Sequence, residues 1–434
     1  MVRTIRSAIR WKREAFILFV AAATAVSSVA TAEPLKMSAG IDNRHSDNAR
    51  EAPSNEESDT ETRLRVSVSH QSDPGRCTSN LGATLGYGYW HSDTFDPETY
   101  TNADFSGECE LAHQLNWAVS DNVRDVSQDS RGPSTPDNTT RKNVFRTGPN
   151  YTIKLSPRDS IQLSAEYENP QFEEAEETDS DRLIGIIAWN RLFSPTFSGG
   201  VSASTDRAEL DTDEEIDKDT LSLVFNKRWP AMRVSGSVGN SRIERDRIES
   251  RFRGVSQESD GVVGDLMLER ELNPSSEIYL QASRQLTDQT SDFDIQFDDF
   301  EFNLRETTTV EVTALEAGLG KRFSDASSVN IGLTASRSDY LQTTDKEERA
   351  GLSLRYSRPL GSRLDFNVGA SMTHYRYEDE GEDDELFNSN VGLTYKASRD
   401  LSVSGQIGHK QRTSDLVSRE YTENWIALGL TYAI

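Results

Sequence analysis

The segment LDFNVGA, residues 364–370, alternates apolar and polar side chains without a break. Successive side chains of a β-strand point to opposite faces, so this pattern predicts a strand with one apolar and one polar face. The same alternation recurs through most of the chain, for example at residues 64–68, 221–225 and 329–335. The sequence therefore predicts an all-β protein built from many strands of this kind.

The first 32 residues predict a secretory signal peptide. Basic residues cluster before residue 14, an apolar run covers residues 15–26, and Ala30-Thr31-Ala32 fits a cleavage site. A transmembrane helix needs roughly 20 apolar residues, so this shorter run is expected to be removed rather than kept as an anchor. We therefore expect a mature chain of residues 33–434, exported by a Gram-negative cell.

The formal net charge of −25 limits the choice of partner. Removal of the basic signal segment leaves the mature chain still more acidic. Binding to a phosphate backbone needs clustered Lys and Arg, so nucleic acid is not expected as a partner. Acidic composition would also suit a disordered chain, but the regular alternation favours a folded one.

Beyond the signal segment, the apolar runs are too short for a membrane helix, so insertion into a membrane would require a closed barrel. Turns rich in Pro, Ser, Gly and Asp lie at residues 156–159, 194–195, 229–230, 273–275, 324–325, 359–361 and 398–400. Long polar stretches alternate with them, at residues 169–181, 206–219, 241–259, 287–309, 339–348, 376–385 and 410–422.

This alternation of connections is typical of bacterial outer-membrane barrels. We predict one transmembrane antiparallel β-barrel of about 18 strands, within a range of 16–20. Its short turns would be periplasmic, its long acidic loops extracellular, and its location the cell outer membrane. A soluble β-sandwich or a β-solenoid is the structural alternative, but a sandwich rarely extends through so many strands.

The last ten residues, WIALGLTYAI, predict a final strand that carries an assembly signal. Gly429, Tyr432 and Ile434 resemble the C-terminal signal read by the barrel assembly machinery, with Ile in place of the usual terminal Phe. We therefore expect that machinery, outer-membrane lipid and lipopolysaccharide among the partners.

Cys77 and Cys109 are the only cysteines. The periplasm is oxidising, so a disulfide between them is expected, which would staple the N-terminal hairpins. Neither has a neighbouring His, so a zinc site is not expected, and no cofactor is predicted.

Three segments resemble a known family as a unit: LNWAVSDN at 115–122, TPDNTTRKNVF at 135–145 and TGPNY at 147–151. They resemble the outer-membrane β-barrel proteins associated with PEP-CTERM and exosortase systems. The resemblance implies a setting of exopolysaccharide synthesis and surface-protein sorting, with exopolysaccharide and periplasmic export proteins as partners. The chain has no PEP-CTERM sorting tail, so it would belong to the export apparatus rather than to its cargo.

Acidic residues gather in the long polar stretches, and basic residues gather near the short turns. Hard cations prefer clustered carboxylates, so a divalent cation could bind the candidate ligands Asp379, Glu382, Asp383 and Asp384. The basic ends could attract an anionic polymer. The alternative is that acidic loops keep the surface soluble while basic residues anchor strand ends at lipid headgroups.

The stretch at residues 292–302 alternates aromatic and acidic residues. Aromatic faces beside carboxylates suit sugar rings, so Phe293, Phe297, Phe300 and Phe302 are candidate glycan contacts or a lumen constriction. The alternative is a hairpin that extends two strands above the membrane. No His is placed beside a nucleophile or carboxylate on a shared strand face, and an enzyme is not predicted.

We therefore expect a pore or accessory component in exopolysaccharide export. The alternatives are a non-transporting structural or surface-binding barrel, whose acidic loops bind cations or glycans, and a general porin. An open polar lumen would favour transport, and a lumen closed by loops would favour the structural role. The sequence does not decide which side-chain set faces the lumen, because a one-residue slip of register exchanges the two faces.

Overall fold

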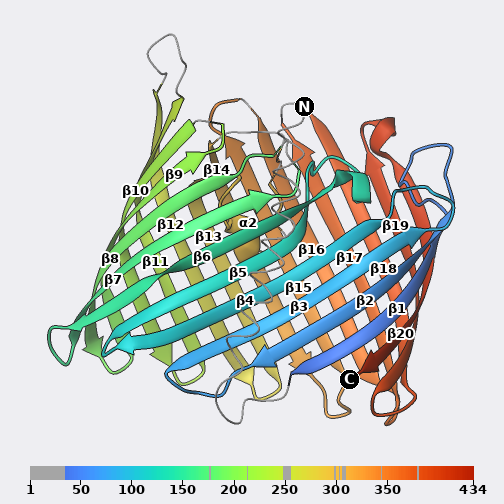
Figure 1. The fold of residues 1–434 in the computed structure, drawn as a ribbon, viewed down its shortest axis with the longest axis horizontal. Coiled ribbons are helices and arrows are strands. Elements are labelled where there is room, and N and C mark those ends of the chain that lie inside the picture. The colour runs from blue at the N-terminus through green and yellow to red at the C-terminus, as the bar shows by residue number, and fades with distance from the viewer. Residues whose placement is uncertain are drawn as a thin grey trace, which may run out of the picture.

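The chain forms one closed antiparallel β-barrel of twenty strands, seen from the side in Figure 1. Our computed structural model describes residues 35–174, 177–212, 214–247, 256–297, 300–302, 304, 309–343, 345–378 and 381–434. Each strand pairs with its neighbours in sequence, and β1 pairs with β20 from Ser38 opposite Ala433 to Ser46 opposite Trp425. This last pairing closes the ring, so no strand edge is left open.

The first ten strands are β1 (Lys36–Ser46), β2 (Asp59–Gln71), β3 (Cys77–Trp90), β4 (Glu98–Ala112), β5 (Leu115–Ser127), β6 (Thr139–Lys154), β7 (Asp159–Phe172), β8 (Ser180–Ser194), β9 (Phe197–Leu210) and β10 (Glu214–Trp229). The other ten are β11 (Met232–Arg247), β12 (Ser256–Asn273), β13 (Ser276–Asp288), β14 (Thr309–Arg322), β15 (Ser328–Tyr340), β16 (Lys346–Pro359), β17 (Leu364–Tyr377), β18 (Glu382–Lys396), β19 (Leu401–Ser414) and β20 (Tyr421–Ala433).

Among the described residues, three short helices lie in the connections: η1 (Pro136–Asn138), α2 (Phe293–Gln296) and η2 (Val417–Arg419). In the part of the chain that the structure describes, no helix is long and apolar enough to cross a membrane.

The two ends of the barrel differ in their connections. At the end that we call the short-turn end, neighbouring strands are joined by connections such as 195–196, 230–231 and 274–275. The predicted turns lie at this end, where Ser, Asn and Asp side chains accept backbone N–H groups, as Asn273 does from Ser275 at 3.0 Å. The chain also ends here, since Ile434 N donates to Met37 O at 2.8 Å. The opposite, long-loop end carries the longer connections.

Twenty strands lie within the predicted range, but the expectation of 18 was too low. The missing strands come from the N-terminal region, where alternation is weak. In β4, polar residues occupy both faces, as in Glu98-Thr99 and Thr101-Asn102, so the local sequence gives little sign of a two-faced strand. Residues 98–112 nevertheless form a strand, because their backbone pairs with β3 on one side and with β5 on the other.

The long polar stretches are largely strand rather than loop. Asp217 and Asp219, in the predicted loop 206–219, lie in β10 and form ion pairs with Arg207 of β9 at 3.4 and 3.2 Å. Opposite charges across paired strands stabilise such extensions. The barrel wall therefore rises further at the long-loop end than sequence alternation predicted.

The apolar side chains of the alternating pattern face outward. Leu221 and Leu223 of β10 are each 60% exposed although both are aliphatic, as the lipid-facing surface of a barrel requires. Side chains of the opposite set, such as Arg182 of β8 and Lys142 of β6, instead contact a loop inside the ring. The structure thereby fixes the register that the sequence left open.

Candidate functional site: the lumen and its inward loops

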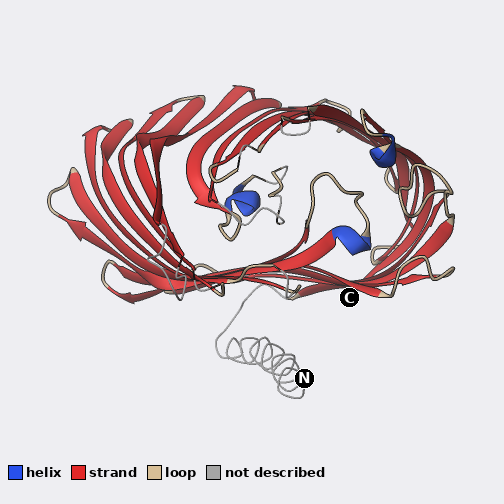
Figure 2. Cartoon of the chain, turned by 90° about the horizontal axis from the view of Figure 1, so that it is seen from above, coloured by secondary structure: helices blue, strands red, loops and turns tan. Residues whose placement is uncertain are grey.

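In the connection between β13 and β14, the described residues 289–297, 300–302 and 304 fold into the barrel rather than out from it. Figure 2 shows short helical segments and loops inside the ring of strands. The described part of this loop contacts β6, β7 and β8, on a wall well removed from β13 and β14 around the ring. We call residues 289–308 the lumen loop. It crosses the interior and narrows it.

An aromatic cluster holds the lumen loop together. Phe293, Phe297, Phe300 and Phe302 are all buried and pack on one another, with ring centroids 4.9 Å apart for Phe293–Phe297 and 4.8 Å for Phe300–Phe302. Around them lie Phe172, Val310, Val312 and Tyr340 of the barrel wall. These four Phe residues were candidate glycan contacts. The structure places their faces against protein, the arrangement of a constriction.

Lys142 of β6 fastens this loop to the wall. Its amine donates to the carbonyl of Ser291 at 2.5 Å and to Asp294 Oδ1 at 2.8 Å, and lies 5.5 Å from the Phe302 ring centroid. The Lys142 side chain is 1% exposed and that of Asp294 is 9% exposed. A charge so buried requires compensation, which Asp294 and the carbonyl supply.

A second buried cation, Arg182 of β8, anchors the start of the lumen loop. It pairs with Asp288, donates to Thr290 Oγ1 at 2.8 Å and to Asp206 at 3.0 Å. Ser180 also donates to Thr290 at 2.9 Å. The guanidinium thereby ties β8, β9 and the end of β13 together.

Arg146 of β6 adds a third attachment. It lies 2.7 Å from Asp292 of the loop and 2.6 Å from Glu168 of β7. On the far side, Glu301 of the loop lies 3.7 Å from Arg349 of β16. Charged contacts on two walls therefore hold the lumen loop in place.

The loop between β5 and β6, residues 128–138, also turns inward. Its Arg131 lies 3.2 Å from Glu347 of β16, and its Gly132 carbonyl accepts from Arg412 of β19 at 2.9 Å. Leu304 of the lumen loop donates its N–H to the carbonyl of Gln128 at 3.1 Å. The two loops thus support each other across the lumen.

A third loop, between β1 and β2, joins them through Glu51. Its carboxylate accepts from Ser134 N at 2.9 Å and from Lys410 of β19 at 2.5 Å. Residues 47–58, 128–138 and the lumen loop therefore form a packed layer inside the long-loop end.

Away from this layer, small neutral polar residues are frequent on the lumen wall from β9 to β18. The strand register places the following at inward positions: Ser202, Ser204, Thr220, Ser222, Ser237, Gly239, Ser283, Gly332, Thr334, Gly351, Ser353, Gly369, Ser371, Thr373, Asn388, Asn390 and Gly392. Several bond to each other, as Thr220 and Ser241 do at 2.8 Å. Such a wall is wettable, and it also carries charges, since the same register places Asp265, Glu316 and Arg355 at inward positions.

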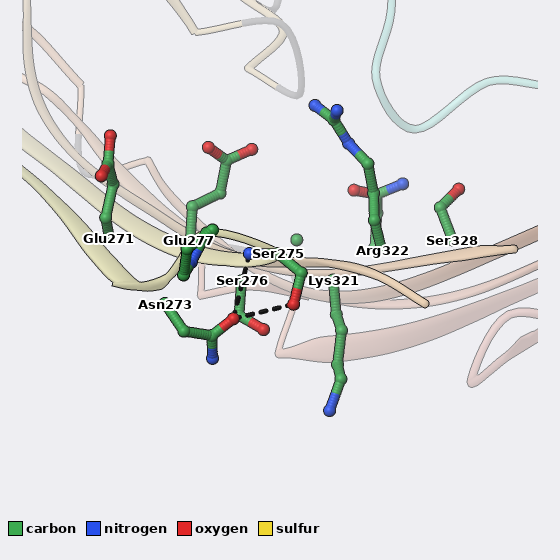
Figure 3. A pocket seen from close by; sticks show the side chains of 11 residues that line it. Glu271, Asn273, Ser275, Ser276, Glu277, Lys321, Arg322 and Ser328 are labelled. Atoms are coloured by element: carbon green, nitrogen blue, oxygen red, sulfur yellow. Dashed lines mark hydrogen bonds between the residues drawn. The ribbon is translucent and has the colours of Figure 1, made fainter. Parts of the chain in front are cut away.

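Figure 3 shows a pocket at the short-turn end, between β12 and β15. Glu271, Glu277 and Arg322 project to one side of the wall, and Lys321 projects to the other. Charged groups of both signs therefore lie at this mouth of the lumen.

The remaining predicted site residues lie apart from the lumen loop. Cys77 of β3 and Cys109 of β4 are register partners joined by a disulfide. Gly429, in the last strand, faces Asp42 and Ser404, whereas Tyr432 and Ile434 are exposed near the short-turn end. Their role as an assembly signal stays a prediction.

The candidate cation ligands are engaged with arginines. Glu382 lies 3.2 Å from Arg419, Asp383 lies 3.1 Å from Arg376, and Asp384 lies 2.5 Å from Arg412. Asp379 lies outside the described residues. Within those residues, no group of three or more His, Cys, Asp or Glu side chains is arranged to hold a metal ion.

Sequence reasoning did not find Lys142, Arg146 or Arg182. Each lies at an inward position of a strand near the long-loop end, where a charge looks like an ordinary polar position. The acidic partners that tie them to the lumen loop and to the end of β13 are far away in sequence, 152 residues for Lys142 and Asp294 and 106 for Arg182 and Asp288. No local pattern connects them.

A closed barrel with an aliphatic exterior and a polar interior defines the class: this is a porin-like β-barrel of the bacterial outer membrane. Comparison of the sequence with known protein families supports this class for the C-terminal part of the chain. Residues 349–434 match the family model described as "Putative beta-barrel porin 2". No curated protein matches the sequence.

Solved outer-membrane proteins share the general form at very low identity. The unliganded ferric citrate transporter FecA is 9% identical, with a TM-score of 0.48, over 94% of this chain and 80% of that one. The siderophore receptor PiuA from Acinetobacter baumannii is 8% identical, with a TM-score of 0.45, over 93% and 82%. OpdK from Pseudomonas aeruginosa is 8% identical, with a TM-score of 0.38, over 93% and 100%.

Proposed function

We propose that this barrel is an outer-membrane channel for neutral, polyhydroxylated solutes, with exopolysaccharide export as its biological role. The observation that carries the proposal is the set of Ser, Thr and Asn side chains, interspersed with glycines, on the lumen wall from β9 to β18. Hydroxyl and amide groups exchange hydrogen bonds with sugar hydroxyls, whereas a strongly charged wall would favour ions. A barrel of this strand number has room for a water-filled passage.

Exopolysaccharide as cargo is supported by the resemblance of residues 115–151 to barrels of PEP-CTERM and exosortase systems. In this proposal, the short-turn end faces the periplasm, where export proteins would deliver the polymer. The long-loop end faces outward in this proposal. The layer of inward loops then limits what passes at the outer end.

The test is single-channel conductance of the refolded protein in planar bilayers, with polysaccharide added to one side at a time. An export channel gives steady conductance that a neutral polysaccharide blocks from the short-turn side. A general porin would instead pass small solutes according to size and show no polymer block. Insertion without any conductance would exclude transport under these conditions.

A non-transporting structural or surface-binding barrel is the second candidate. The observation in its favour is the packed layer itself, in which three loops are joined to one another and to the barrel wall by hydrogen bonds and ion pairs. A barrel that stays closed even after the lumen loop is shortened would support this role.

A further inference from the structure

A cavity of about 530 Å³ lies in the lumen wall, directly beside the seam where β1 meets β20. Its lining comes from β1–β5, β19 and β20, and we call it the seam pocket. It adjoins buried residues such as Ser46 and Trp90, at the base of the loop layer. Its size falls within the roughly 300–1,000 Å³ of small-ligand sites.

Two aromatic rings of the seam pocket lie flat on glycines of neighbouring strands. Trp425 faces Gly408, where an added Cβ would lie 2.2 Å from Trp425 Cε2. Tyr100 lies over Gly88, where an added Cβ would be 2.8 Å from Tyr100 Cε2. Because glycine leaves this space free, each ring can lie along the wall. The Arg63 guanidinium covers the Tyr100 ring, so the Trp425 ring is the candidate stacking surface.

Arginines fix these rings without leaving a free charge. Arg63 lies 3.6 Å from the Tyr100 ring centroid and pairs with Glu61 at 2.9 Å. Arg44 lies 5.2 Å from the Trp425 ring centroid and pairs with Glu423 at 2.7 Å. With each guanidinium matched by a carboxylate, the pocket offers donors and acceptors in balance.

We infer that the seam pocket binds one or two rings of a neutral oligosaccharide. Sugar C–H faces pack on aromatic rings, and sugar hydroxyls both donate and accept hydrogen bonds. Carboxylates can accept them, while Asn102 and Gln406 at the edges of the pocket do both. The absence of an unmatched positive charge among these Arg pairs disfavours an acidic sugar. This inference rests on the proposed channel and names a binding step within it.

The experiment is titration of the detergent-solubilised barrel with maltotriose and cellotriose, followed by calorimetry, with trigalacturonate as the acidic counterpart. We expect a neutral trisaccharide to bind and trigalacturonate to bind at least about tenfold more weakly, a difference of about 1.4 kcal/mol. Trp425→Ala should weaken neutral binding about tenfold, while Trp425→Phe, which keeps a ring, should change it much less. Trp229→Ala, on the barrel exterior at the short-turn end, is the matched control.

Folding of each variant is checked by the heat-dependent shift of the barrel on a gel. If Trp425→Ala does not fold, Gln406→Ala and Trp425→Phe carry the test, with Gln406→Ala expected to weaken binding. Tighter binding of trigalacturonate, or equal binding by the wild type and the pocket variants, overturns the inference. Conductance without saccharide binding overturns this site and leaves the channel standing. Saccharide binding without conductance overturns the proposed channel function and leaves the seam pocket as a saccharide-binding site.

Discussion

Lys142 is one of three cationic side chains that hold the lumen loop to the wall of β6 and β8. Its amine is buried with Asp294, and removal of one member of such a pair leaves the other charge uncompensated. We expect Lys142→Ala to destabilise the folded barrel by about 3 kcal/mol, the lower end for breaking a buried ion pair. Urea unfolding in detergent, followed by tryptophan fluorescence, measures the change in free energy of unfolding.

Lys154 lies on the same strand, is exposed and supplies the control. Lys154→Ala should shift stability by no more than about 0.5 kcal/mol. Replacing both partners, as Lys142→Met with Asp294→Leu, removes both charges and should recover much of the loss. Equal effects of Lys142→Ala and Lys154→Ala would show that the ion pair does not hold the loop.

Two lumen-facing glycines differ in the space around them and allow a matched comparison of single substitutions. An added Cβ at Gly200 of β9 would lie 1.8 Å from the carbonyl oxygen of Trp189, whereas one at Gly82 of β3 would meet nothing within 4 Å. Gly200→Ala should therefore strain the β8–β9 pairing and lower the yield of folded barrel, while Gly82→Ala should not. The fraction that resists heat-induced migration on a gel gives the comparison, and indistinguishable yields would refute the close approach.

The elements divide into those that the sequence predicts and those that it cannot. Strands such as β17 follow from alternation, because one face meets lipid and the other water. The inward path of the lumen loop was one of several alternatives, since an aromatic and acidic segment also suits an extended hairpin. Its position depends on contacts with Lys142, Arg146 and Arg182, which come together only when the ring closes.

The lumen loop as a whole sets the width of the channel in our proposal. Replacing residues 292–302 with a short glycine linker removes the Phe cluster but leaves the β13–β14 register from Ser276 to Asp288 intact. We expect a several-fold increase in single-channel conductance from this loop variant. Gln296→Ala is the control, because Gln296 is exposed and, among the described residues, its side chain bonds to Asp292 of the same loop. An unchanged, low conductance in the loop variant would place the barrier in another loop.

At the scale of the whole molecule, closure between the first and last strands makes the lumen the passage. Ile41 and Leu430 are register partners across the seam, and both side chains face outward. Cysteines at the two positions should form a disulfide, because antiparallel partners lie about 4.5–5.5 Å apart between Cα atoms. This cross-link joins the first strand to the last strand on the outer face of the barrel, so it does not enter the lumen.

We expect Ile41→Cys/Leu430→Cys to leave conductance and polysaccharide block unchanged, since solute would pass through the ring and not between β1 and β20. Ile41→Cys/Leu64→Cys, which links β1 to β2 instead, controls for the cross-link itself. Both are compared before and after reduction, with Cys77 and Cys109 already joined to each other. Loss of conductance or polymer block in the oxidised seam variant alone would mean that the seam opens during transport. The closed ring would then be one state of a barrel that works by lateral opening, and the lumen wall would no longer be sufficient to explain what passes.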